Sequence, residues 1–185
     1  MILFECERPQ DGPFIETLLD TVFGPDRVRK SSYRLREARP PLAEFSQVAR
    51  EGAQLLATVR YWPVIIRDML TGTQTDALLL GPLGVHPGKR GRKLGQTLVR
   101  RSLAAVDSAG VAHVILVGDP AYFKGFGFHP ALPRYITMPG GVDADRLMIR
   151  SSGLSQSLPS VGQVVPCIDY TARSAATSDH LTAVR

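Results

Sequence analysis

The sequence lacks any long apolar run free of charge. Its longest such stretch, Ala77 to Val85, has about nine residues, whereas a helix that crosses a membrane needs about 20. The first residues also lack the basic segment of a secretory signal, because acids occur already at Glu5 and Glu7. We therefore expect no membrane span, no secretory leader and a cytoplasmic protein.

Cysteine is scarce as well. The only two cysteines, Cys6 and Cys167, lie outside any CxxC pair and outside any Cys/His cluster with the spacing of metal ligands. The scarcity excludes a disulfide-rich scaffold. We interpret both residues as reduced, structural thiols and expect no metal.

Acidic residues are absent from Ala77 to Val106, although the chain has 17 Asp and Glu against 22 Lys and Arg. This segment therefore carries the whole excess behind the formal net charge of +5. A local basic strip on a nearly neutral protein favours one anionic ligand over an extended nucleic-acid surface, so we do not expect nucleic acid as a partner. A solvated helix face is the alternative. The basic residues are Lys89, Arg90, Arg92, Lys93, Arg100 and Arg101.

The remaining composition is that of a globular protein, with 44% hydrophobic and 21% charged residues in 185. We predict a single domain over residues 1–170, followed by a C-terminal tail over 171–185. Hydrophobic spacing predicts an α/β or α+β domain with a mixed sheet. The predicted strands are 2–7, 42–50, 54–66, 77–85, 113–117, 134–138 and 146–150, and the helices are 15–22, 28–38, 92–109 and 120–124; 71–76 is a predicted loop and 161–168 an apolar patch.

Two local features stand out in the middle of the chain. Pro82 lies within a predicted strand, where proline indicates a bulge or an edge. The strand then runs into a basic turn with three glycines, Gly88 to Gly95, that opens a helix. The unpaired N–H groups of a first helical turn bind anions. The turn matches neither the Walker loop nor the dinucleotide fingerprint, so it predicts another type of phosphate site.

Two sequence blocks resemble the GNAT superfamily of acetyl-CoA-dependent acetyltransferases, in particular bacterial predicted N-acetyltransferases. The first is LGPLGVHPGKRGRKLG, residues 80–95, and the second is GDPAYFKGFGF, residues 118–128. They occur in the family's order, separated by one helix and one strand. The resemblance covers about residues 1–170. It implies a mostly antiparallel central sheet flanked by helices and splayed at a bulged central strand.

The resemblance also implies an activity: transfer of an acetyl group from acetyl-CoA to a primary amine of a small molecule or protein, directly within a ternary complex. A non-catalytic acyl-CoA-binding module with the same fold is the alternative. Members of the family often associate with themselves, so a homodimer is compatible with the resemblance. Neither a metal nor a membrane partner is implied.

The cosubstrate site follows from the matched positions. The loop amides would hold the pyrophosphate of CoA, and the backbone of Leu83 and Val85 would pair with the pantetheine and the thioester. A backbone contact at Leu83 would also stabilise the oxyanion. The implied cosubstrate-binding residues are Leu83, Val85, Lys89, Arg90, Gly91, Arg92, Lys93, Leu94, Gly95, Tyr122, Phe123 and Lys124.

Two positions depart from the family pattern. Lys93 stands where the family has glycine, and its side chain either clamps the phosphates or crowds them. Phe123 stands where many members have the tyrosine that protonates the departing thiolate. Tyr122 is adjacent but turned by about 100° on a helix. We keep Tyr122 and Asp119 as candidate catalytic residues.

No general base is evident from sequence alone. Asp119, His86 and Glu44 are candidates by residue type, although each also fits a structural role, as a helix cap, a loop residue and a strand-face charge. Water is a further candidate. The histidines His113, His129 and His180 are predicted to be surface or turn residues.

The resemblance places the acceptor pocket between two loops, Phe23–Arg27 and Pro139–Asp143. Tyr61 and Trp62 could line the same cleft, but we expect them to pack in the sheet.

Overall fold

A 9-stranded sheet forms the centre of the molecule. The computed structural model describes residues 1–29, 31–37, 39–132, 134–152 and 157–170. Its strands are β1 (Ile2–Cys6), β2 (Gln47–Glu51), β3 (Gln54–Asp68), β4 (Gln74–Val85), β5 (His113–Val117), β6 (His129–Pro130), β7 (Tyr135–Thr137), β8 (Leu147–Ser151) and β9 (Val161–Pro166). The helices are α1 (Gly12–Phe23), α2 (Ser31–Arg34), α3 (Leu94–Ser108) and α4 (Pro120–Phe123), with 3-10 turns at Pro9–Asp11, Pro25–Arg29, Pro87–Lys89, Lys124–Phe126 and Ala144–Arg146.

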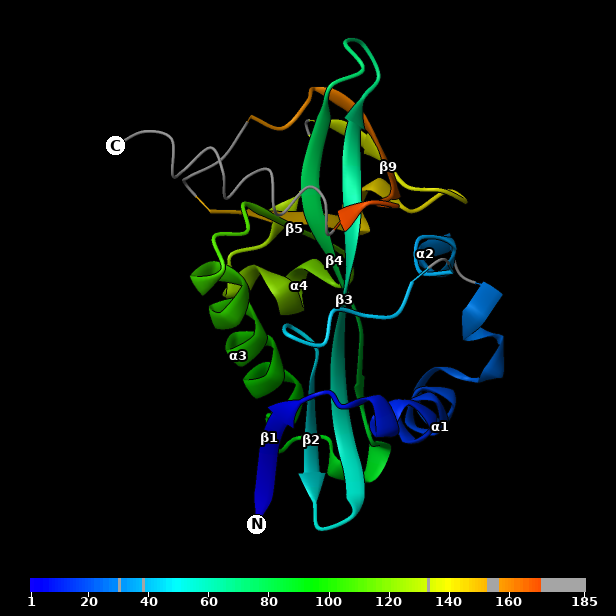
Figure 1. Cartoon of the computed structure of the whole chain (residues 1–185), viewed down its shortest axis with the longest axis vertical. Coiled ribbons are helices and arrows are strands. Elements are labelled where there is room, and N and C mark those ends of the chain that lie inside the picture. The colour runs from blue at the N-terminus through cyan, green and yellow to red at the C-terminus, as the bar shows by residue number, and fades with distance from the viewer. Residues whose placement is uncertain (30, 38, 133, 153–156, 171–185) are drawn as a thin grey trace.

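The strands follow the order β1-β2-β3-β4-β5-β8-β6, and β9 joins β3 to β7. Pairing is antiparallel except between β4 and β5 and between β7 and β9. The long β3–β4 hairpin runs through the middle of the molecule, with α3 on one side of it and α1 and α2 on the other (Figure 1). The mixed, mostly antiparallel sheet predicted from the sequence is confirmed.

Both faces of the central hairpin are buried. Successive side chains of a strand point to opposite faces, so Tyr61 and Leu78 join one hydrophobic cluster with α3, while Trp62 and Leu79 join another. The Tyr61 hydroxyl is fully buried and lies 2.9 Å from Ser102 Oγ of α3. Burial raises the pKa of this phenol. Tyr61 therefore ties α3 to the sheet, as its predicted packing role requires.

A bulge changes the course of β4. Three residue steps from Leu80 to Leu83 lie opposite only two from Val59 to Tyr61. A bulge bends its strand and increases the local twist. The strand nevertheless continues to Val85 on β3, so Pro82 marks a bulge as predicted. On the other side, β4 pairs with β5 only at Leu78 and Leu79, and the two strands separate beyond that point.

Several predicted elements differ from the observed ones. The predicted helix 28–38 is a 3-10 turn followed by the four-residue α2. The predicted strand 42–50 begins only at Gln47, because Ser46 N–H donates to Leu42 O and closes a turn. The predicted loop 71–76 already belongs to β4 from Gln74 onward. Strand β7 pairs with β9, the predicted apolar patch, and β8 pairs with β5 and β6.

The predicted C-terminal tail, 171–185, lies outside the described residues and includes His180. Within the described ranges, no helix combines the length and apolarity that crossing a bilayer requires. The same residues contain no group of three or more His, Cys, Asp or Glu side chains arranged to hold a metal ion.

Close packing at Gly118 yields a test of the fold. A Cβ built at Gly118 would lie 2.4 Å from Phe123 Cε2 and 2.9 Å from Leu116 Cδ1. We expect Gly118→Ala to lower the free energy of unfolding by about 1–3 kcal/mol, because overpacking forces neighbours to shift. Chemical denaturation measures the change. Gly125→Ala is the matched control, since nothing lies within 4 Å of its built Cβ; an equal loss in both variants would contradict the packing argument.

Candidate active site

A cavity of about 680 Å³ lies where β4 separates from β5. A volume of this order accommodates a small-molecule ligand. Its walls come from the bulged part of β4, the end of β5, α4 and two distant loops, including Phe23, Arg27 and Asp143. The structure thus brings together the second motif block and both loops predicted to form the acceptor pocket.

The edge of β4 that faces this separation presents backbone groups. His86 N–H donates to Leu56 O of β3 at 2.8 Å. Backbone groups alternate in direction along a strand, so the amides of Leu83 and Val85 face away from β3. Strand β5 does not pair with these residues. The two predicted pantetheine contacts therefore lie on an open strand edge, and Leu83 lines the cavity.

The basic turn leads directly into α3. Arg90, Gly91, Arg92 and Lys93 are exposed, and Leu94 begins the helix. Lys93 is the N-cap and adopts the left-handed region with φ 58° and ψ 17°, where glycine is favoured. Its own side chain makes no capping hydrogen bond. The N–H groups of the first turn of α3 are therefore not capped by the Lys93 side chain, and such groups bind anions.

The basic residues that flank the turn are not equivalent. Lys89 Nζ lies 3.2 Å from Glu51 Oε2 at the end of β2. The hydrogen bond from Lys89 lowers the pKa of the Glu51 carboxyl. His86 Nδ1 accepts from Gly88 N–H at 3.2 Å and shapes the turn, whereas Lys124 is exposed beside α4. A ligand phosphate would have to break the Glu51 ion pair to bind Lys89, whereas Arg92 acts on Glu51 only through its charge, without an ion pair.

Glycine allows α3 to approach β4 and α4 closely. A Cβ at Gly95 would lie 3.1 Å from the Tyr122 hydroxyl and 3.2 Å from Val85 Cγ2. The Tyr122 hydroxyl therefore packs against the first turn of α3. Burial raises the pKa of Tyr122, against the opposing field of Arg100, so this phenol is protonated at neutral pH.

Phe123 is a buried cavity wall, 8% exposed. Its ring packs edge-on against Tyr122 and Phe128, with centroids 4.9 and 5.9 Å away. No proton can come from this side chain. Many members of the GNAT superfamily, which this sequence resembles, have a tyrosine at this position. Here the position is apolar.

Two carboxylates line the cavity within the described residues, and both cap short helical turns. Asp119 Oδ1 accepts from Ala121 N–H at 2.9 Å, and Asp143 Oδ1 accepts from Asp145 N–H at 3.1 Å. The cap role predicted for Asp119 is confirmed. Glu44 is exposed and lines a different cavity.

The predicted surface position of His113 is wrong, and that of His129 is correct. His113 is 1% exposed, and its Nδ1 lies 2.9 Å from Ser151 Oγ. His129 is exposed. His113 of β5 pairs with Ser151 of β8. This contact joins segments far apart in the sequence, so local patterning does not reveal it.

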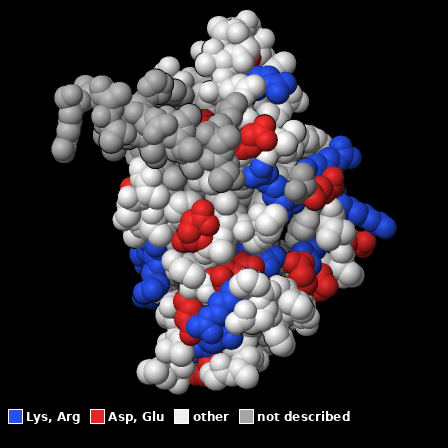
Figure 2. Space-filling model, in the orientation of Figure 1, with Lys and Arg blue, Asp and Glu red and all other residues white. Residues whose placement is uncertain are grey.

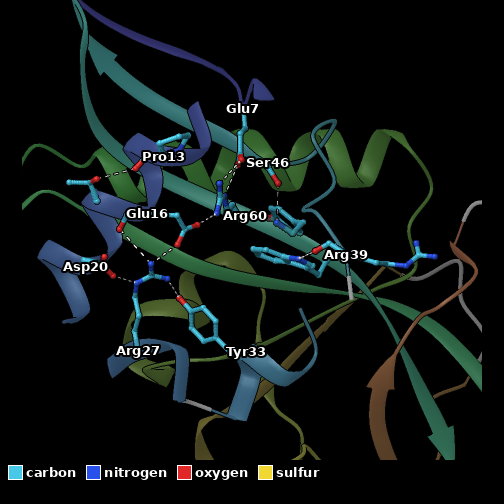
Figure 3. Close-up of polar contacts among 12 residues, drawn as sticks. Glu7, Pro13, Glu16, Asp20, Arg27, Tyr33, Arg39, Ser46 and Arg60 are labelled. Carbon is cyan, nitrogen blue, oxygen red and sulfur yellow. Dashed lines mark hydrogen bonds and ion pairs between the residues drawn. The ribbon is translucent and has the colours of Figure 1, made fainter. Parts of the chain in front are cut away.

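An ion-pair network lies beside the cavity, which two of its members, Arg27 and Tyr33, also line; Figure 3 shows its contacts. Arg27 is 4% exposed and contacts Glu16, Asp20 and the Tyr33 hydroxyl. Arg60 binds both oxygens of Glu7, at 2.8 and 2.7 Å, and Glu16 at 2.6 Å. These bonds join α1, the 25–29 turn, α2 and β3, so they position the loop after α1.

Arg36 and Tyr33 also line the cavity, and sequence analysis did not identify them. They lie in the polar segment 28–38, which the sequence predicts as a helix, and its several arginines are the sole signal that could have pointed to them. Trp62 packs in the sheet as expected, 5% exposed. Its indole N–H donates to Arg39 O at 3.1 Å, and its ring also lines a side cavity of about 190 Å³ next to the main one.

Acidic and basic side chains are interspersed over the visible face around β1, α1 and α2 (Figure 2). They do not form one continuous patch of positive charge on this face. The distribution agrees with local ion pairs and a local anionic ligand rather than with a broad nucleic-acid surface.

The comparisons with known proteins agree with this geometry. Residues 13–131 match the family model described as "Acetyltransferase (GNAT) domain". The uncharacterized N-acetyltransferase YhbS of Escherichia coli K12 is 32% identical over 130 residues, which are 70% of this chain and 75% of YhbS.

Solved structures show the same likeness. The crystal structure of E. coli YhbS in complex with CoA gives a TM-score of 0.69 at 26% identity and covers 92% of both chains. A GNAT family acetyltransferase from Brucella melitensis in complex with acetyl-CoA gives a TM-score of 0.67 at 25% identity, covering 92% of this chain and 98% of that one.

The network at Arg27 predicts an acid-sensitive fold. Burial opposes the ionisation of Glu16, but hydrogen bonds from Arg27 and Arg60 outweigh it and lower the pKa of that carboxyl. A depressed native pKa stabilises the fold above the unfolded pKa, and this stability is lost as pH falls through the native pKa. We expect the gap in unfolding free energy between wild type and Glu16→Gln to be largest at pH 7 and to shrink towards pH 3. Urea denaturation at several pH values measures it, and Glu44→Gln, at an exposed site, should show no such trend.

The left-handed Lys93 predicts a stabilising substitution. A non-glycine residue in this region costs about 1–2 kcal/mol, while glycine loses part of that gain through its freer unfolded state. We expect Lys93→Gly to raise the free energy of unfolding by about 0.5–1 kcal/mol in chemical denaturation. Arg92→Gly is the control, because φ at Arg92 is not positive. A gain in the control but not in Lys93→Gly would rule out the backbone explanation.

Proposed function

We propose that this chain, which belongs to the GNAT acetyltransferase family, moves an acetyl group from acetyl-CoA to a primary amine held in the same ternary complex. The chain is an N-acetyltransferase with the CoA-binding fold of that family. One observation carries the finer proposal: the open edge of β4 borders, at Leu83, a cavity that also reaches both loops proposed to hold the acceptor. A donor on that edge and an acceptor in the cavity would meet without a covalent enzyme intermediate.

The residues present fit acetyl-CoA. The amides from Arg90 to Gly95 lie in the turn before α3 and in its first two residues. The helix dipole favours a phosphate at this end of the helix. Arg92 and Lys93 are exposed beside these amides, and Lys124 adds charge from the neighbouring α4 side. Tyr122 packs against Gly95, so we assign its hydroxyl to cosubstrate binding near the end of the pantetheine.

The chemistry places demands on a few protein groups. The amine attacks the thioester carbon, a C–N bond forms, the C–S bond breaks, and the sulfur leaves as thiolate. The Leu83 amide donates to the carbonyl oxygen and stabilises the charge that develops there. Positioning both reactants in one cavity supplies much of the rate. Cytoplasmic location and self-association into a homodimer belong to the same proposal.

Proton transfer does not use Phe123, which has no proton to give. Asp119 is oriented by its cap to Ala121 N–H and lines the cavity, so it can accept the amine proton directly or through water. A thiolate with a parent pKa near 8.5 is a tolerable leaving group without a tyrosine acid. The proposal thus accounts for an active transferase with an apolar residue at the usual acid position.

Calorimetry and CoA release test the proposal together. We expect acetyl-CoA to bind wild type with a micromolar Kd, and we expect free thiol to appear when a panel of primary amines is added. We also expect Phe123→Tyr to raise kcat at least about tenfold, because a positioned general acid contributes 10²–10⁴-fold. Phe126→Tyr is the control, since Phe126 contacts Phe123 but does not line the cavity.

The outcomes separate catalysis from mere binding. Binding of acetyl-CoA with no thiol release from any amine, by wild type or Phe123→Tyr, would favour the non-catalytic acyl-CoA-binding module. Binding by Lys93→Gly alone would show that the Lys93 side chain blocks the phosphate site. Absence of binding in all variants would rule out both acyl-CoA functions.

A further inference from the structure

Arg36 holds an unusual position at the acceptor end of the cavity. It lies in the turn after α2, and its guanidinium carbon is 4.7 Å from the centroid of the Tyr33 ring and 4.9 Å from that of Trp62. Two aromatic faces therefore hold the flat guanidinium in place. Arg36 lines both the main cavity and the side cavity beside it.

Carboxylates share both cavities with Arg36: Glu37 lines the side cavity, and Asp119 and Asp143, which cap short turns, line the main one. The carboxylates of Glu16, Asp20 and Glu7 are bound by Arg27 and Arg60. Within the described ranges, no carboxylate forms an ion pair with Arg36, and its buried Nε has no hydrogen-bond partner. Burial lowers the pKa of Arg36 to about 10; the interaction with the Tyr33 hydroxyl opposes this shift, and the charges of Arg27 and Arg60 add to it. The guanidinium still carries its charge at neutral pH, and a buried cation is stabilised by an anion that binds it.

The position of Arg36 also relates it to the reacting atoms. Its Nη2 lies 3.6 Å from a Cβ built at Gly81, so a larger residue there would approach the guanidinium. Gly81 is two residues from Leu83, whose amide is the proposed oxyanion contact. Two residues of extended chain span at most about 7 Å. An anionic group on Arg36 and a nucleophile at the thioester would therefore be only a few bonds apart.

We propose that Arg36 binds the carboxylate of the acceptor, and that the acceptor is a small amino acid or similar compound whose primary amine lies a few bonds from that carboxylate. The inference rests on the proposed function in one respect: the amine of the bound acceptor is the group that acetyl-CoA acetylates. The planar guanidinium donates two parallel N–H bonds to a carboxylate, which fixes the orientation of the amine as well as the affinity. Arg27 cannot take this role, because its donors are already used.

Matched acceptor pairs test the proposal in the full-length protein. Three pairs compare a carboxylate with its amide: glycine with glycinamide, β-alanine with β-alaninamide, and L-phenylalanine with L-phenylalaninamide. A fourth pair, O-phosphoethanolamine with ethanolamine, tests whether a phosphate is preferred instead. Thiol release from acetyl-CoA gives kcat and KM for each. Loss of the carboxylate charge makes the amine of an amide easier to deprotonate, so intrinsic reactivity favours the amides.

We expect the best carboxylated acceptor to exceed its amide roughly 10- to 100-fold in kcat/KM, mainly through KM, as a charged hydrogen bond predicts. Arg36→Gln should abolish this preference, and Arg36→Lys should restore part of it through charge without the fork. The control is Arg34→Gln, because Arg34 is exposed and lines neither cavity. Equal use of amides, or an unchanged preference in Arg36→Gln, would overturn the proposal while leaving acetyl transfer intact. An Arg36-dependent preference for O-phosphoethanolamine would overturn the carboxylate assignment.

A second readout does not depend on turnover. Trp62 is the only tryptophan of the chain, and it contacts the Arg36 guanidinium. We expect the carboxylated amines, and not their amides, to change Trp62 emission in a saturable way that Arg36→Gln abolishes. If no amine releases thiol but this titration saturates, the proposed function fails and the carboxylate site stands. If neither thiol release nor a saturable emission change occurs, the carboxylate site fails as well.

Discussion

The site depends on unequal pairing along β4. This strand pairs with β3 as far as Val85, but with β5 only at Leu78 and Leu79. The bulge opposite Val59 and Tyr61 lies where the pairing with β5 has ended, and a bulge bends and twists its strand. A regular ladder would satisfy the amide of Leu83 with a neighbouring strand and close the cavity. Partial pairing instead leaves backbone groups of β4 unpaired at the wall of the cavity.

Two glycines allow α3 and α4 to pack closely beside the point where β4 and β5 separate. Gly95 lets α3 lie close to Val85 and Tyr122, and Gly118 lets the ring of Phe123 fold back over the end of β5. The basic turn before α3, the open strand edge and α4 are thereby held at short distances from one another. The same contacts explain why Phe123 is buried, since its ring packs against Gly118, Tyr122 and Phe128.

Electrostatics divides the arginines around the acceptor end into two classes. Arg27 and Arg60 are neutralised by acids of α1 and of the segment after β1, and they fasten the loops. Arg36 is held by aromatic rings instead. A guanidinium that is held by aromatic rings and binds no carboxylate retains N–H groups that can donate to a ligand. A guanidinium bound by two carboxylates already uses most of its N–H groups in those ion pairs. This difference makes Arg36 suited to recognition and the other two suited to structure.

The order of residues along the chain determined the local parts of this protein. Helical and alternating spacing predicted α1, α3, β3 and β5, and the two motif blocks identified the bulged strand, the basic turn that leads into α3 and the apolar Phe123. These features depend on residues close in sequence. Tertiary structure alone decided that His113 is buried, that β7 pairs with β9, and that Arg36 lies between Tyr33 and Trp62. Periodicity shows which face of an element is buried but not which distant segment covers it, because that choice is made by packing and charge neutralisation across the whole chain.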